Sequence, residues 1–224
     1  MKLLPHVGTD AHNGSMGEPL LPLFPLSLVL LPGTQLPLHI FEERYREMIG
    51  EALEKQSEFG IVLLMPQGLA HVGCTARIRN LLGRHDDGRM DIMTEGHNRF
   101  EIISGDNSRS FLQAKVRYFD DDPEQEETPP EVFEKVLRGY YALQNLQPEL
   151  AELRLNDSQI SFQFGQASDD PGLRQRLIES TSEAGRMGLL ATHFAEILPQ
   201  KQALSKLKKA AATNGHSKHP PVIQ

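Results

Sequence analysis

The stretch LPLFPLSLVLLPGTQLPLHIFEERYR, residues 21–46, decides the fold that we expect for this chain. It contains the most apolar part of the sequence, yet prolines interrupt it repeatedly, so it cannot form the roughly 20-residue helix that spans a bilayer. Pro32-Gly33 is a turn signal, because proline presets the backbone angle φ and glycine accepts a positive one. The flanking runs, residues 29–31 and 36–38, are therefore predicted to be strands.

A helix is predicted directly after this stretch. Its apolar residues recur at spacings of three and four and share one helical face, namely Tyr45, Met48, Ile49, Ala52 and Leu53. Glu42 and Glu43 stand at its start, where the helix dipole favours anions. Two acid–base pairs four residues apart, Glu42 with Arg46 and Glu51 with Lys55, support the same helix.

The sequence from residue 59 to residue 118 is typical of further strands. The continuous apolar run 59–64 indicates a strand that is buried on both faces. Residues 71–78 alternate, which places four apolar side chains on one face, those of Val72, Cys74, Ala76 and Ile78. Asp87-Gly88 supplies a hairpin turn, and Phe100 and Ile102 continue the period of two. Several short strands with one early helix predict a compact, partly closed β-barrel or sandwich.

The composition changes once along the chain. Residues 120–130, DDDPEQEETPP, are acidic, rich in proline and free of apolar side chains, so we expect a solvated linker. The two ends carry no apolar periodicity and are expected to be disordered. The predicted segments are an arm at residues 1–18, a barrel subdomain at 19–119, the linker at 120–130, a helical subdomain at 131–212 and a tail at 213–224.

The part of the chain after the linker is predicted to be helical. An apolar stripe recurs at helical spacing from Val132 to Leu143. Asp170-Pro171 has the residues that favour a helix start, and Ser182 is a plausible cap for a third helix. Pro199 is expected to break that last helix. The fold class predicted for the whole chain is therefore α+β, with a barrel first and a helical bundle second.

The composition excludes several function classes. The chain has 224 residues and a net charge of −7, which disfavours nucleic acid as a partner unless a basic patch is strongly localised. The only basic cluster, at residues 201–209, is also explained by a solvated helix end. Cys74 is the single cysteine, so an internal disulfide is excluded and a reducing, cytoplasmic location is expected. No membrane association is predicted.

No arrangement of residues in the sequence points to catalysis. Residues 83–89 have glycines at the spacing of a phosphate-binding loop, but arginine replaces the lysine, and a hairpin turn explains them better. His71 and Cys74 lack the second pair that a closed zinc site needs. Cys74 itself lies on the apolar face of a strand, where a thiol packs rather than reacts. We therefore predict no catalytic residue, no cofactor and no metal site.

The opening stretch closely resembles the start of the N-terminal domain of Lon proteases. That family shows a Pro-Leu-Phe-Pro strand, a Pro-Gly turn, a Leu-Pro-Leu strand, and then Ile-Phe-Glu and Arg-Tyr before a helix, all of which are found in residues 22–45. Val72-Gly73-Cys74-Thr75-Ala76-Arg77-Ile78 is similar to the family's Val-Gly-x-x-Ala-x-Ile strand. Gly96 with Arg99-Phe100 is similar to its Gly-x-x-Arg-Phe. The resemblance is good over residues 20–118 and loose in the helical half.

This resemblance implies a pseudo-barrel of the PUA-like type followed by a helical bundle. It also implies that the chain corresponds to the part of Lon that recognises protein substrates and helps to assemble the oligomer. We expect this part to stand alone here, without the ATPase and protease domains. Expected partners are unfolded or peptide-like protein segments, with a protease or chaperone as a further candidate partner, and a homo-oligomer is left open. The alternative is an RNA-binding protein, because PUA-like barrels elsewhere bind RNA.

The predicted partner-binding residues lie near the first strands of the barrel. They are Phe24, Leu26 and Met48. The physical motive is the run at residues 20–26, in which alternate apolar side chains must point away from the barrel core and could form an exposed strip. The competing interpretation is that the helical half covers this strip. A positive cleft would favour RNA, whereas an exposed apolar groove would favour protein.

We predict neither ATP hydrolysis nor proteolysis, because the sequence holds no phosphate-loop lysine and no nucleophile paired with a base. Steady-state assays with ATP, magnesium and casein should give no turnover above the buffer blank. Turnover that survives repurification and disappears on a single substitution would contradict this prediction.

Overall fold

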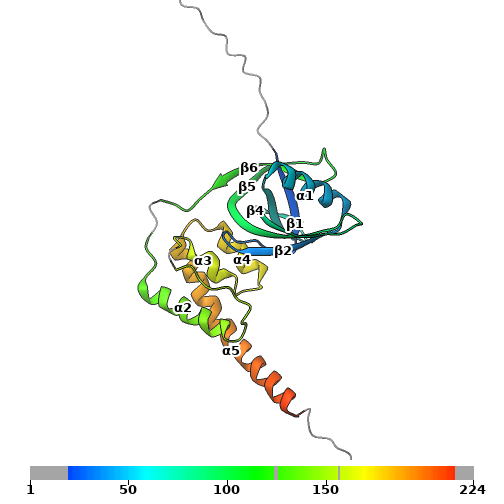
Figure 1. Cartoon of the computed structure of the whole chain (residues 1–224). Coiled ribbons are helices and arrows are strands. Elements are labelled where there is room, and N and C mark those ends of the chain that lie inside the picture. Colours follow the sequence, from blue (N-terminus) through cyan, green and yellow to red (C-terminus); the bar gives the residue numbers. More distant parts are fainter. Residues whose placement is uncertain (1–19, 124–125, 156, 215–224) are drawn as a thin grey trace, which may run out of the picture.

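A computed structural model of the chain describes residues 20–123, 126–155 and 157–214 (Figure 1). The predicted arm at residues 1–18 and the tail beyond Asn214 lie outside the described residues. The elements in chain order are β1 (Leu21–Leu26), β2 (Gln35–Ile40), α1 (Glu43–Lys55), β3 (Phe59–Met65), β4 (Gly68–Arg84), β5 (Met90–Asp106), β6 (Gln113–Phe119), α2 (Pro130–Gln144), α3 (Ile160–Gly165), α4 (Pro171–Glu179) and α5 (Glu183–Asn214).

The six strands form one mixed sheet that closes on itself. Their order is β2-β5-β4-β3-β1-β6, and β5 also pairs with β6. The first half of β5 pairs with β2 and its second half with β6, so this strand joins the two ends of the sheet. Shifts of register between β4 and β5, for example between Cys74 and Ala76, bend the long strands enough to close the ring. The expected barrel with one early helix is confirmed.

The Pro32-Gly33 turn is fixed by contacts with β5. Gly33 has a φ of 70° and donates its N–H to the carbonyl of Gly96 at 2.9 Å. Gly96 in turn donates to the carbonyl of Thr34 at 2.9 Å. A Cβ atom on Gly96 would overlap the carbonyl oxygen of Leu31, so only glycine allows this close approach. Gly96 therefore allows the loop that precedes β2 to pack closely against β5.

Apolar side chains pack on both faces of the curved sheet. One cluster joins the sheet to α1, and Phe24, Tyr45, Met48 and Ile49 belong to it. The second cluster lies on the opposite face, since Leu23 belongs to it and adjacent residues of a strand alternate. Its other buried members are Leu21, Val62, Phe100 and Ala114.

The helices α2 to α5 lie together beside the barrel, apart from α1 (Figure 1). α2 packs along α5, and a third apolar cluster joins these helices to the barrel through Val29 and Leu31 of the β1–β2 loop and Val72 of β4. The start of α4 is capped as predicted, because the side chain of Asp170 accepts a hydrogen bond from the N–H of Gly172 at 2.9 Å. Ser182 likewise accepts from the N–H of Gly185 at 3.1 Å. The predicted helical bundle is confirmed.

Residues 29–31, predicted to be a strand, lie instead in the loop between β1 and β2. Two further local predictions are wrong. α5 continues through Pro199 to Asn214 instead of breaking. Ala195, the residue whose carbonyl loses its helical partner, is exposed, so that carbonyl remains open to water and the proline is tolerated. The second difference concerns Arg46, whose guanidinium donates to the carbonyl of Asp87 at 2.7 Å rather than pairing with Glu42. The predicted Glu51–Lys55 pair is present at 2.8 Å.

Phe100→Ala should destabilise the protein by about 3–5 kcal/mol, because a large buried side chain would be replaced by a cavity. The ring is fully buried, and it lies against Gly60 and Gly73, where an added Cβ would come within 2.6 Å of its tip. Urea unfolding measures the change. Ile103→Ala is the matched control on the same strand, and it should cost little because Ile103 is 52% exposed. Equal losses in both variants would contradict the assignment of faces on β5.

Candidate functional site

An apolar groove runs between α2 and α5. It has a volume of about 440 Å³. Gly139 on α2 lets the two helices approach closely, because an added Cβ would come within 2.9 Å of the Phe194 ring on α5. The lining residues are Glu131, Lys135, Arg138, Gly139, Ala142, Ala191, Phe194, Ala195 and Leu198. The groove is hollow because most of its apolar residues have side chains too short to fill the space between the helices.

The groove has an apolar floor and a charged rim. Ala195 is exposed and Leu198 is half-buried, so apolar atoms reach solvent there. Glu131, Lys135 and Arg138 are all exposed and bring charges of both signs. Arg138 also pairs with Glu134 one turn away at 2.5 Å. An apolar centre with a polar rim is the usual composition of a protein-binding surface.

A buried ion network holds the helices against the barrel. Asp121 lies between Arg99 of β5 and Arg186 of α5, with N–O distances of 2.6 Å to Arg99 and 2.5 Å to Arg186. The side chains of the two arginines are 2% and 0% exposed, and that of Asp121 is 9% exposed. The prediction of a solvated linker is therefore wrong at Asp121, whereas the neighbouring Asp120 is 86% exposed.

Further groups complete the coordination of the two arginines. Arg186 donates to the hydroxyl of Ser161 at 2.7 Å and pairs with Glu183 at 2.7 Å. Both guanidinium groups donate to the carbonyl of Ser180, at 2.5 and 2.8 Å. The ring of Phe162 lies 4.3 Å from the Arg186 guanidinium carbon and 5.3 Å from that of Arg99. Each charge is thus paired and hydrogen-bonded, as buried charges must be.

The protonation state of Asp121 follows from these contacts. Burial alone would raise the pKa of its carboxyl group, but the hydrogen bond from Arg186 and the charges of both arginines together hold the pKa below its usual value. Burial lowers the pKa of Arg99, whereas the pairing with Asp121 and Glu183 outweighs burial at Arg186 and raises its pKa. We interpret the network as structural, because its charged groups are bound to one another and nearly sealed from solvent.

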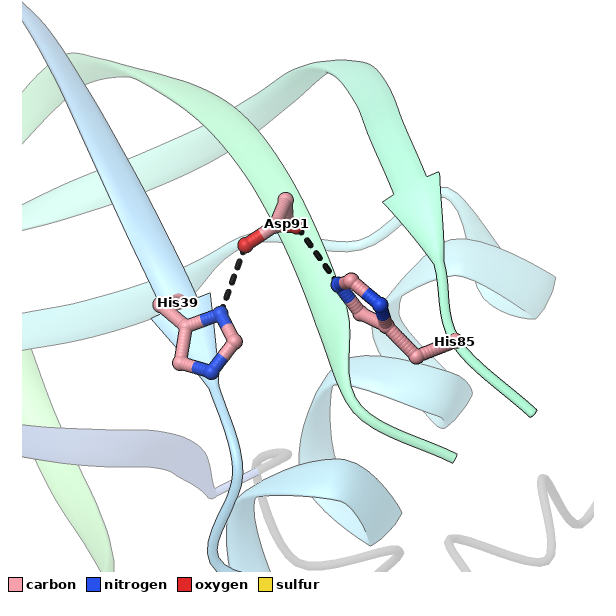
Figure 2. Close-up of side chains that lie close together, drawn as sticks. All are labelled: His39, His85 and Asp91. Atoms are coloured by element: carbon pink, nitrogen blue, oxygen red, sulfur yellow. Dashed lines mark hydrogen bonds and ion pairs between the residues drawn. The ribbon is translucent and has the colours of Figure 1, made fainter. Parts of the chain in front are cut away.

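A second polar cluster lies on the barrel surface, where His39 and His85 flank Asp91 (Figure 2). Nδ1 of His39 lies 2.6 Å from one carboxylate oxygen of Asp91, and Nε2 of His85 lies 2.8 Å from the other. Hydrogen bonds from His39 and His85 lower the pKa of Asp91. Sequence spacing missed this cluster, because its members come from three different segments that only the strand pairing brings together.

The arginines of the barrel surface mostly neutralise acidic neighbours. Arg77 pairs with Glu58 at 2.8 Å and Arg79 with Glu95 at 2.7 Å, although both arginines line a hollow beside the end of α1. Arg109 binds Glu47 and Glu51 on α1. These pairings cancel much of the positive potential that an RNA backbone would require.

A match to a known protein family covers most of the chain. Residues 20–201 match the family model of the ATP-dependent protease La (Lon) substrate-binding domain. The chain belongs to this family. The match confirms the resemblance seen in the first strands, and it extends through the helical half as far as the middle of α5.

Two solved structures have the same fold as this Lon-type domain. One is a Lon N-terminal domain protein from Xanthomonas campestris, with 23% sequence identity and a TM-score of 0.59 over 78% of this chain and 98% of that one. The other is the N-terminal domain of the Mycobacterium avium complex Lon protease, with 17% identity and a TM-score of 0.57 over 79% and 98% of the two chains. Within the residues described for this Lon-type domain, no helix is long and apolar enough to cross a membrane.

The structure places the three predicted partner-binding residues in or beside the apolar cluster under α1. Phe24 is buried, with its ring centroid 4.2 Å from that of Tyr45. Met48 is 1% exposed, and half-buried Leu26 packs against the same cluster. A direct contact between a partner and Phe24 or Met48 would require the Lon-type domain to open locally. Their role in binding stays a prediction, and exposed residues of the groove are better placed.

The predicted apolar strip at the first strand is not exposed. Leu21 and Leu23 are buried against Val62 and Phe100, so other strands of the barrel cover them, rather than the helical half. Cys74 is buried as predicted, and burial raises the pKa of its thiol to about 12. The groove between α2 and α5 was missed because a hollow between two helices depends on how closely they pack, and helical periodicity gives only which face is apolar.

Asp121→Asn should lower the free energy of unfolding by about 3–5 kcal/mol at pH 7, because it removes the carboxylate shared by two buried arginines. Among the described acidic residues, Arg99 then keeps only the exposed Asp120 at 3.7 Å, and Arg186 keeps only Glu183. Because the pKa of Asp121 is lower in the folded chain than in the unfolded one, its contribution is present above the unfolded value of about 3.9 and is lost as pH falls through the folded value. The difference between wild type and variant, measured by urea unfolding, should therefore shrink below about pH 4.

Asp120→Asn is the matched control for this experiment. Asp120 is 86% exposed and lies 3.7 Å from Arg99, so its loss should change stability by less than about 0.5 kcal/mol. A cost for Asp121→Asn that equals the control, or that does not depend on pH, would show that the network is not needed to join barrel and helices.

Proposed function

We propose that this domain binds unfolded or peptide-like protein segments and carries out no reaction on them. The observation that carries the proposal is the apolar groove between α2 and α5, in a chain whose family is a substrate-binding domain. An apolar groove binds a peptide by removing apolar surface from water. The free energy gained in this way depends little on the order of residues in the peptide. Such a site suits partners that share exposed apolar side chains rather than one sequence.

The rim residues support a preference for extended or helical segments of mixed charge. Glu131, Lys135 and Arg138 stand along one side of the groove, so a bound segment can pair with charges of either sign. Segments released by or destined for a protease or chaperone fit this description, and we propose them as the natural partners. A cytoplasmic location belongs to the same proposal, because the single cysteine allows no internal disulfide of the kind common in secreted proteins.

The test is a binding titration with labelled, unfolded casein and a labelled RNA oligomer at two salt concentrations. Casein should bind weakly without nucleotide, and its affinity should persist as salt rises, because apolar burial does not depend on counterion release. Ala195→Glu places a charge in the groove, and we expect it to weaken casein binding about tenfold, which corresponds to about 1.4 kcal/mol. Ala195 is exposed, so the variant should fold normally.

Ala203→Glu is the matched control. It makes the same change on the same helix, at an exposed position that does not line the groove. Equal affinities for casein in the two variants would place the binding surface elsewhere. Tight, salt-sensitive binding of RNA without binding of casein would instead favour the RNA-binding alternative.

A further inference from the structure

The pairing of strands brings two histidines and one aspartate to the same point of the barrel surface. In the register of β2 and β5, His39 lies directly opposite Asp91. On the other side of β5, Gly83 of β4 lies opposite Asp91, and an added Cβ there would contact the carboxylate at 3.4 Å. That is an ordinary van der Waals distance, and His85 reaches the same carboxylate from the β4–β5 turn (Figure 2).

The three side chains converge on one point. Their nitrogen and oxygen ligand atoms all lie within 4.8 Å of one another. Among the described residues, this is the only group of three or more such side chains with that geometry. Each side chain is between 38% and 46% exposed, so the point on which they converge is open to solvent.

We propose that His39, His85 and Asp91 form a binding site for a divalent transition-metal ion of the zinc class. Two imidazole nitrogens with one carboxylate are ligands that such ions prefer, whereas magnesium and calcium prefer oxygen ligands alone. Only three protein ligands are present, so at least one position would remain for water or for a side chain of a bound partner. The site is outside the groove and does not depend on the proposed binding of polypeptides.

The observed geometry needs only small changes to admit an ion. Carboxylates only accept hydrogen bonds, so the histidine nitrogens that face Asp91 now carry the protons. A zinc ion about 2.0–2.2 Å from each ligand would hold neighbouring ligand atoms about 3.4 Å apart. The present separations are 2.6 and 2.8 Å, each to a different oxygen of Asp91, and all three ligand atoms lie within 4.8 Å of one another. The exposed side chains must therefore shift by about 1 Å, and the rings must take the other tautomer.

A bound ion would connect three segments of the barrel. β2 is the end strand of the sheet and pairs with β5 alone among the named strands. An ion shared by His39, Asp91 and His85 would tie this strand and the β4–β5 turn to the start of β5. Because such an ion binds the folded chain, it should also raise the unfolding temperature.

The experiment is calorimetric titration of the full chain with zinc chloride, together with thermal melts. The histidines of both chain ends can bind zinc by themselves, so the background is the quadruple variant His6→Gln, His12→Gln, His216→Gln and His219→Gln. This background should bind one ion per chain. His39→Ala and His85→Ala should each weaken binding by about tenfold or more and abolish the rise in melting temperature.

His71→Ala is the matched control, because His71 is also exposed on β4 but lies outside the cluster. It should bind zinc as the background does. NMR of the background gives a second readout that needs no variant of the cluster. The ring ¹⁵N signals of His39 and His85 should shift when zinc is added. Absence of binding in the background, unchanged ring signals, or equal affinity in the His39, His85 and His71 variants would overturn the proposal.

Discussion

The ion network around Asp121 is the interaction on which the arrangement of the molecule depends. It joins β5, the linker and α5, three parts of the chain that are far apart in sequence. Removing charges from water is costly, and a buried pair repays that cost only where every group is hydrogen-bonded. Here the carbonyl of Ser180 and the hydroxyl of Ser161 supply the remaining partners. Because these hydrogen bonds are directional, the network favours one orientation of the helices against the barrel. Apolar packing alone would let the helices slide along the barrel.

The position of the groove follows from this docking. Arg186 is in the first turns of α5, so the network fixes where that helix begins relative to the barrel. Apolar packing then sets the rest: Phe194 lies against Gly139 of α2, and small residues on both helices leave the hollow beside it. The groove thus shares Ala191 and Phe194 with the apolar core of the helices, and a helix broken at Pro199 would have shortened the groove at Leu198.

Much of the fold could be predicted, because it depends on local patterns. The spacing of Tyr45, Met48 and Ile49 identified α1, and alternation correctly grouped Cys74, Ala76 and Ile78 of β4, although both faces of that strand are buried from Val72 to Ala76. The burial of Asp121 could not be predicted, since its neighbours are acidic and exposed and its partners lie far along the chain. The same reason hid the cluster of His39, His85 and Asp91. Long-range pairing decides such sites, and no spacing in one sequence encodes it.

An extended segment could also bind by adding a strand to the free edge of the sheet, but the sequence of the end strand disfavours this. β2 is the end strand, and Pro37 stands in the middle of it. Proline is accommodated in a sheet where its missing N–H faces away from the neighbouring strand, so the free edge of β2 lacks a donor there. An added strand would lose a hydrogen bond at this point, which is how natural edges avoid unwanted pairing. A polypeptide would therefore gain more from side-chain contacts in the α2–α5 groove than from extending the barrel.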